Sequence, residues 1–278
     1  MTDKGPLTGR GEAPLGVYDS GIGGLTVVRA LRQALPHERI VYLGDTARIP
    51  YGTRSPATVI KYAIGCAQHL AARKVKAIVI ACNTVSAVAI DRLRVELDIP
   101  ILGVVEPGAR AAVRSSPRGR IGVLATSATT LSGAYPRAVA AESTRAEVFG
   151  QAAPLLVPLA EEGWTDGDVP RLAALRYLEP LARAGVDVVV LGCTHYPLLR
   201  GVLEAGAREL MGPDVGIVDS ASAVAHETRE FLQTRGLDRT TEDGGGIELR
   251  VTDIPRTFEA VASRFLGMAL PAVEQVDL

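Results

Sequence analysis

The sequence predicts an α/β protein with two similar halves, each containing a mainly parallel sheet. Apolar runs of strand length alternate with segments of helical period through most of the 278 residues, which is typical of parallel strands covered by helices. Three pairs of strand landmarks also recur in the same order, at offsets of 106, 111 and 113 residues: Gly16 and Gly122, Cys82 and Cys193, Gly103 and Gly216. This regularity indicates an internal duplication with a pseudo-two-fold axis, against the alternative of chance similarity between strand–helix units.

The first half contains four predicted strands, at residues 15–18, 40–43, 77–81 and 101–105. A helix after the first strand ends at Pro36 and carries one apolar stripe: Leu25, Val28, Leu31 and Leu35. After the second strand comes a long polar loop, residues 44–55, and then a helix from Pro56 to about Lys74.

The second half repeats this order with predicted strands at 120–126, 187–192 and 215–219, and with a further strand-like run at 155–159. After Asp219 we expect a helix to about Arg235, a strand at 247–251 and a helix at 255–266. Because the duplicate is complete by Asp219, these last elements are expected to return to the first half. The predicted domains are therefore 15–108 plus 220–278, and 109–219, after a disordered tail at 1–14.

The composition argues against several classes of protein. A net charge of −1 and 4% aromatic residues do not suit a nucleic-acid-binding surface. No apolar run approaches the ~18 residues of a membrane span, and the amino terminus lacks the pattern of a signal peptide. Three cysteines without a CxxC pair fit a reducing compartment. We therefore expect a cytoplasmic protein without nucleic-acid or membrane partners.

The scarcity of lysine and histidine favours catalysis without a cofactor. The four lysines all lie in the first 76 residues, and none is well placed to hold pyridoxal phosphate as a Schiff base. The four histidines are scattered, without an HxH or HExxH pattern, so no metal site is expected.

The cysteines at the ends of two apolar strands are the leading candidates for catalytic groups. Cys82 and Cys193 each end a strand and precede a helix, where ligands bind in open α/β sheets and where the helix start is expected to lower a thiol's pKa. Buried cysteine is common as a small apolar residue, but a matched pair suggests two acid/base groups facing each other across a pocket. Cys66 instead lies at core spacing on a helix and is expected to be structural.

A glycine-rich turn, residues 19–24, follows the first strand and opens a helix. It fails the dinucleotide pattern at Thr26, so we expect its backbone N–H groups to bind a smaller anion such as a carboxylate. Asp19 either orients a substrate ammonium group or a thiol, or is a plain helix N-cap.

Three further segments are candidates on weaker grounds. Pro50-Tyr51-Gly52 lies in the long loop, and such loops are often functional, although an ordinary turn is equally compatible. His195 is either an acid/base group, a donor to substrate or a satisfied surface histidine. Glu161 and Glu162 follow the run at 155–159 and either face the pocket or form a solvated acidic turn.

Taken together, these motifs resemble those of the bacterial glutamate racemases. The resemblance runs from about residue 15 to residue 267 and rests on five ordered segments: 19–25, 50–52, 82–84, 122–126 and 192–197. It implies a cofactor-independent enzyme of two pseudo-symmetric α/β domains with the active site in the cleft between them. It also implies a homodimer that supplies D-glutamate for peptidoglycan in the cell wall.

By this resemblance Cys82 and Cys193 are the two proton donors and acceptors, and Asp19, Glu161 and His195 are auxiliary catalytic groups. It further implies these substrate contacts: Asp19, Ser20, Pro50, Tyr51, Gly52, Asn83, Thr84, Thr126, Thr194 and His195. The alternative is a racemase of aspartate or of another amino-acid derivative in the same superfamily. In the aspartate enzymes Thr-Glu typically follows the second cysteine, whereas Thr194-His195 follows it here.

Overall fold

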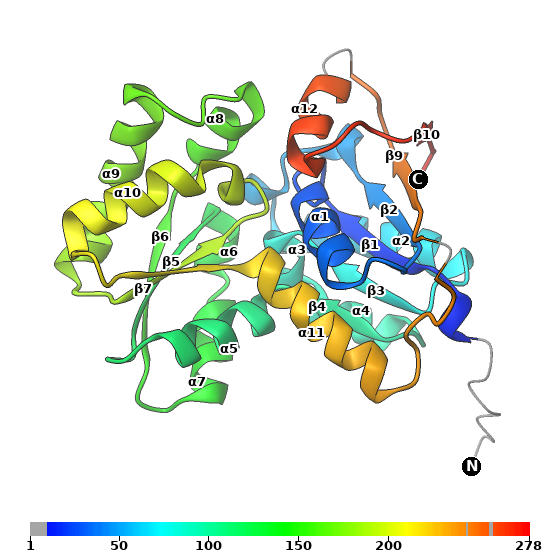
Figure 1. Cartoon of the computed structure of the whole chain (residues 1–278), viewed down its shortest axis with the longest axis horizontal. Helices are drawn as coiled ribbons and strands as arrows, with labels where there is room; N and C mark the ends of the chain where they lie inside the picture. Colours follow the sequence, from blue (N-terminus) through cyan, green and yellow to red (C-terminus); the bar gives the residue numbers. More distant parts are fainter. Residues whose placement is uncertain (1–9, 243, 256–257) are drawn as a thin grey trace.

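The computed structural model describes residues 10–242, 244–255 and 258–278, and their strands form two separate sheets (Figure 1). The first sheet has the order β10-β9-β2-β1-β3-β4 and the second the order β6-β5-β7-β8, with every pairing parallel. The predicted α/β class with mainly parallel sheets is therefore confirmed.

The strands are β1 Leu15–Asp19, β2 Ile40–Gly44, β3 Ala77–Ile80, β4 Ile101–Gly103, β5 Arg120–Ala125, β6 Glu147–Ala152, β7 Val188–Gly192, β8 Gly216–Asp219, β9 Ile247–Val251 and β10 Val273–Gln275. The helices are α1 Leu25–Ala34, α2 Pro56–Ala72, α3 Asn83–Val88, α4 Ile90–Glu96, α5 Val105–Ser115, α6 Ser127–Leu131, α7 Ala134–Glu142, α8 Leu156–Glu162, α9 Asp168–Arg183, α10 Arg200–Met211, α11 Ser220–Thr234 and α12 Phe258–Leu266. Short 3-10 helices are η1 Arg10–Glu12, η2 Thr46–Arg48, η3 Tyr51–Thr53 and η4 Tyr196–Leu199.

The duplication is visible in the strand order and in the register. The segment β2-β1-β3-β4 of the first sheet has the same order as β6-β5-β7-β8. Gly16 pairs with Ile78, and Gly122 pairs with Val189. In each sheet the cysteine follows four residues after the glycine's partner, so Cys82 and Cys193 occupy equivalent positions.

In the second half, one predicted element was wrong and one strand was missed. The run at 155–159 is not a strand but the start of α8, whose buried side chains Leu156 and Ala160 are one helical turn apart. Pro158 is tolerated because it lies in the first turn, where its missing N–H has no helical partner. The strand in this region is β6, whose residues are half-buried or exposed at the sheet edge and therefore form no apolar run.

Two smaller expectations also differ. The helix from Pro56 ends at Ala72, and Lys74 adopts a φ of 57° beyond it. Of the predicted disordered tail, residues 1–9 lie outside the described part of the chain. The tail was predicted too long, since η1 is ordered and Lys76 Nζ donates a hydrogen bond to the Gly11 carbonyl oxygen at 2.7 Å.

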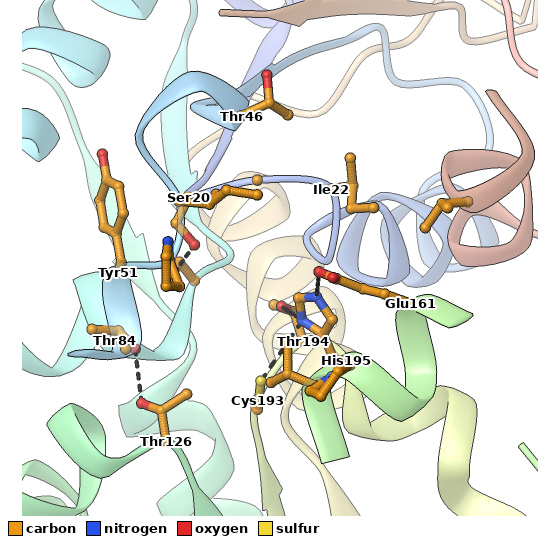
Figure 2. A pocket seen from close by; sticks show the side chains of 18 of the residues that line it. Ser20, Ile22, Thr46, Tyr51, Thr84, Thr126, Glu161, Cys193, Thr194 and His195 are labelled. Atoms are coloured by element: carbon orange, nitrogen blue, oxygen red, sulfur yellow. Dashed lines mark hydrogen bonds and ion pairs between the residues drawn. The ribbon is translucent and has the colours of Figure 1, made fainter. Parts of the chain in front are cut away.

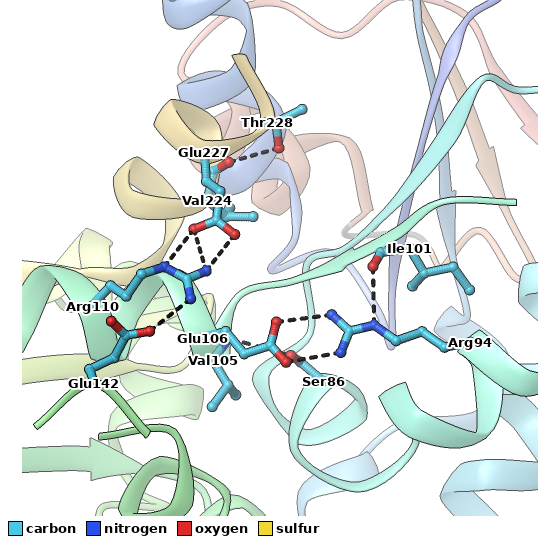
Figure 3. Close-up of polar contacts among 10 residues, drawn as sticks. All are labelled: Ser86, Arg94, Ile101, Val105, Glu106, Arg110, Glu142, Val224, Glu227 and Thr228. Carbon is cyan, nitrogen blue, oxygen red and sulfur yellow. Dashed lines mark hydrogen bonds and ion pairs between the residues drawn. The ribbon is translucent and has the colours of Figure 1, made fainter. Parts of the chain in front are cut away.

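Helices α5 and α11 lie at the boundary between the two sheets (Figure 1). Arg110 of α5 donates to the carboxylate of Glu227 on α11 at 2.5–3.1 Å and to Glu142 on α7 at 3.0 Å (Figure 3). The expected domain boundary after residue 108 would divide helix α5. Because α5 packs on β7 and β8 of the second sheet, we propose that the boundary lies at Val104 instead. No helix in the described part of the chain has both the length and the apolar character needed to cross a membrane.

Candidate active site

A cavity of about 740 Å³ lies between the carboxyl ends of the two sheets, where a doubly wound fold binds ligands. Figure 2 shows side chains from both sheets turned toward it, with Ser20, Tyr51 and Thr84 on one side and Cys193, Thr194 and His195 on the other. Twelve of the predicted site residues line it: Ser20, Pro50, Tyr51, Gly52, Cys82, Asn83, Thr84, Thr126, Glu161, Cys193, Thr194 and His195. The structure thus brings together segments that are up to 175 residues apart in the sequence.

Both predicted thiols reach this cavity although both cysteines are 6% exposed. Cys66, by contrast, lies on the buried face of α2 among apolar side chains, where burial raises the pKa of its thiol to about 12. The cysteine expected to be structural is therefore outside the cavity.

The surroundings of Cys82 favour the neutral thiol. Burial and the nearby charge of Asp19 raise the pKa of Cys82 to about 12, although Ser20 Oγ lies 3.3 Å from its Sγ. The predicted lowering of this pKa by the start of the next helix is therefore wrong for the free protein. Loss of hydration outweighs the short helix α3 that follows the thiol.

The surroundings of Cys193 are different, because a histidine and a glutamate lie beside it. His195 Nδ1 is 3.8 Å from Cys193 Sγ, and His195 Nε2 is 2.9 Å from Glu161 Oε1 (Figure 2). Burial alone would lower the pKa of His195, but its contacts with Cys193 and Glu161 raise it to about 10. The ring is therefore an imidazolium at neutral pH, and it attracts negative charge on Cys193 Sγ.

Asp19 does not line the cavity but lies beneath the glycine-rich turn, with 1% of its surface exposed. Its Oδ2 accepts a hydrogen bond from Gly21 N at 2.9 Å, whereas its buried Oδ1 has no hydrogen-bond partner. It is not the N-cap of α1, because that helix begins after Gly24. Burial raises the pKa of Asp19, and the charge of His195 opposes that shift.

Hydroxyl and amide groups connect the two sides of the cavity. Thr84 Oγ1 lies 3.0 Å from Thr126 Oγ1, which joins the end of β3 to the end of β5 (Figure 2). Asn83 accepts a hydrogen bond from the Tyr135 hydroxyl at 2.8 Å, so its side chain is held by the second sheet's helices. On the opposite side, Thr26 Oγ1 donates to the Thr194 carbonyl oxygen at 2.9 Å.

The loop that carries Tyr51 is held by a buried carboxylate, so it is more than an ordinary turn. Asp45 is completely buried and accepts hydrogen bonds from Arg48 Nε at 2.7 and 2.8 Å, from Thr252 Oγ1 at 2.9 Å and from the Tyr51 hydroxyl. Tyr18 donates in turn to the Tyr51 oxygen at 3.1 Å. This network fixes η3, where a Cβ added at Gly52 would lie 3.1 Å from the Thr126 side chain after β5.

Several lining residues escaped prediction because no motif marks them. They include α12 residues and a residue shortly before that helix: Pro255, Phe258, Ala260, Val261 and Arg264. Glu162 was expected either to face the pocket or to lie in a solvated turn, and it lines the cavity. Within the described residues, no three His, Cys, Asp or Glu side chains are grouped closely enough to hold a metal ion.

Comparison with known proteins gives a family and a fold. A family model described as Asp/Glu/Hydantoin racemase matches residues 25–228. A glutamate racemase from Geobacter metallireducens is 48% identical over 264 residues, which cover 95% of this chain and 96% of that protein.

Solved structures agree over nearly the whole chain. The glutamate racemase of Francisella tularensis in complex with D-glutamate has a TM-score of 0.88 and 36% identity, covering 96% of this chain and 98% of that one. The glutamate racemase of Thermus thermophilus in complex with β-chloro-D-alanine has a TM-score of 0.85 and 44% identity with the same coverage. Two equivalent strand-end thiols line one cavity of this protein. From these comparisons, the chain belongs to the Asp/Glu/Hydantoin racemase family and is an isomerase.

Proposed function

We propose that this protein interconverts L- and D-glutamate without a cofactor, with Cys82 and Cys193 as its two bases. One observation carries the proposal: equivalent strands of two duplicated sheets each end in a thiol at the same cavity. Glutamate is favoured as the substrate because relatives that match nearly the whole chain are named glutamate racemases.

Two bases on opposite faces invert an amino acid without turning it over. One thiolate takes the proton from Cα, and the electron pair of that C–H bond is delocalised into the α-carboxylate, which becomes an enediolate. The opposite thiol then gives its proton to the other face of Cα and becomes the thiolate. No proton is gained or lost overall, and by the family resemblance Cys193 serves L-glutamate and Cys82 serves D-glutamate.

The protonation of the free site suits the L-enantiomer. The raised pKa of Cys82 keeps it a thiol at neutral pH, ready to donate. His195 Nδ1 lies 3.8 Å from Cys193 Sγ, so the imidazolium places a positive charge beside the sulfur that we propose accepts the proton. The two roles therefore follow from their different surroundings.

The remaining polar groups suit the charge that develops on the substrate. Ser20, Thr84, Thr126 and Thr194 are hydroxyl donors around the cavity, and preorganised donors in comparable anion sites contribute roughly 3–4 kcal/mol each. Asp19 lies beneath the turn that borders Cys82, where it acts on the thiol through its charge.

Circular dichroism of L- and D-glutamate with protein dialysed against a chelator tests the function. We expect interconversion of both enantiomers to an equal mixture, without absorbance from pyridoxal phosphate. Activity that is lost on dialysis and restored by a metal or pyridoxal phosphate would contradict the proposal. Faster turnover of aspartate than of glutamate would favour the alternative substrate class.

In the cell, we propose that the protein is a cytoplasmic homodimer that provides D-glutamate for peptidoglycan. This extends the activity named for its relatives, since a racemase that acts on free glutamate needs no membrane. Sedimentation of the purified protein tests the dimer.

A further inference from the structure

Helix α12 lines one side of the cavity and contacts the second sheet's helix α8. Arg264 of α12 lines the cavity, and its Nη1 donates a hydrogen bond to the carbonyl oxygen of Glu161 at 2.6 Å. It is the one lysine or arginine among the described lining residues. Its side chain is exposed, so replacing it removes little from the core.

The end of α8 is shaped to receive this guanidinium. Gly163 follows the helix with a φ of 77°, and a Cβ there would lie 2.6 Å from Arg264 Cζ and 2.8 Å from Nη1. The last carbonyl groups of a helix have no partner within it and carry partial negative charge, so a cation bound there stabilises the final turn.

The residue after Arg264 contacts His195, which is the hydrogen-bond partner of the Glu161 side chain. Phe265 is completely buried, and its ring meets the His195 ring edge-on, with centroids 5.0 Å apart and planes at 76°. Consecutive residues of α12 therefore hold the backbone of Glu161 and the ring of His195, whose side chains are 2.9 Å apart.

We propose that Arg264 is a positioning residue that fixes the end of α8 so that the Glu161 carboxylate stays on His195, which in turn keeps its charge beside Cys193. The proposal rests on the proposed function in taking Cys193 as a base. It concerns Cys193 first, because His195 lies against Cys193 Sγ, whereas the direct side-chain contact of Cys82 is with Ser20.

Site-resolved alkylation of the free protein tests this step without any turnover of glutamate. Trypsin releases the three cysteines on separate peptides, residues 62–73, 77–92 and 184–200, so mass spectrometry follows each thiol in one sample. In Arg264→Ala we expect iodoacetamide to modify Cys193 about tenfold more slowly, because a displaced His195 places less positive charge beside the attacking sulfur. Cys82 in the same sample controls for any change in access to the cavity.

A second variant reaches the same contact from the other side. Gly163→Ala places a Cβ against the guanidinium, whereas Gly185→Ala carries a similar φ of 67° with only ordinary contacts. We expect Gly163→Ala to slow alkylation of Cys193 relative to Cys82, as Arg264→Ala does. Gly185→Ala should keep the wild-type ratio, which separates the contact from general backbone strain.

Steady-state kinetics give the second readout. Arg264→Ala should lower kcat about tenfold with little change in KM, because misplacement of a catalytic group weakens the reaction rather than binding. Arg264→Lys, which keeps one donor and the charge, should restore most of the rate. In a Glu161→Gln background, Arg264→Ala should have little further effect, because the two residues act in one chain of contacts.

Two outcomes would overturn the proposal. An unchanged ratio of Cys193 to Cys82 alkylation in Arg264→Ala would show that the guanidinium does not act through the His195 pair. A raised KM with unchanged kcat would show that Arg264 binds substrate directly. A wild-type protein that fails to racemise glutamate would refute the proposed function, yet the alkylation ratio would still report on Arg264.

Discussion

Replacing Gly23 by alanine is the most direct test of how tightly the two halves meet at the active site. A Cβ at residue 23 would lie 2.3 Å from Thr194 Oγ1 and 2.5 Å from the His195 ring. Ordinary contact begins at 3.4 Å, so these side chains must move by about 1.1 Å. The atoms affected belong to two residues of the proposed catalytic machinery, and they are the ends of side chains rather than backbone.

A displacement of this size should lower the catalytic rate strongly but should not prevent folding. A misplacement of about 1 Å can cost about 100-fold in rate. The loss of the His195 contact with Glu161 or Cys193 alone would act in the same direction. We therefore expect Gly23→Ala to fold and to retain about 1% of the wild-type kcat/KM.

Circular dichroism of glutamate measures kcat and KM in both directions, and thermal unfolding checks the fold. Gly201→Ala is the matched control, because nothing lies within 4 Å of the added Cβ and alanine favours the helix α10. It should keep wild-type activity. A Gly23→Ala protein within threefold of wild type would refute the close approach on which this reasoning depends.

Three further predictions concern the thiols. Cys82→Ala and Cys193→Ala should each lower racemisation by several orders of magnitude in the circular dichroism assay, since general acid–base catalysis alone contributes roughly 10²–10⁴-fold, whereas Cys66→Ala should retain most activity. In D₂O, the D-glutamate formed early from L-glutamate should carry deuterium, because the opposite thiol delivers a solvent-exchanged deuteron, whereas the remaining L-glutamate should carry little. Equal labelling of both enantiomers, measured by NMR, would argue for a single base. Because the pKa of Cys82 is raised to about 12, its alkylation should rise about tenfold per pH unit from pH 7 to 9. A rate that begins to level off as the pH approaches 9 would instead show an ordinary thiol, whose pKa is ~8.5.

The strand-end cysteines were predictable because two local rules agree at them. Buried β-branched runs specify parallel strands, and the carboxyl ends of parallel strands meet at one edge of each sheet. That reasoning located Cys82 and Cys193 and the polar residues next to them, and the structure brings these residues to one cavity.

The features that escaped prediction depend on contacts between distant segments. Strand β6 is an exposed edge strand with no apolar run, and the run at 155–159 is too short to separate a helix from a strand by periodicity. The pKa of Cys82 depends on burial by the whole fold and on Asp19, which a local helix-start rule ignores. Arg264 is an exposed arginine on a late helix, and its role depends on Glu161, 103 residues earlier.

The unequal surroundings of the two thiols are compatible with a reaction that has no thermodynamic preference. L- and D-glutamate have equal free energies in water, so kcat/KM must be the same in both directions whatever the protein does. Stabilising the Cys82 thiol and the charge beside Cys193 therefore cannot favour one product. The different surroundings can instead make kcat and KM for L-glutamate differ from those for D-glutamate. Variants of Glu161, His195 or Arg264 should change these individual values, while kcat/KM stays equal in the two directions.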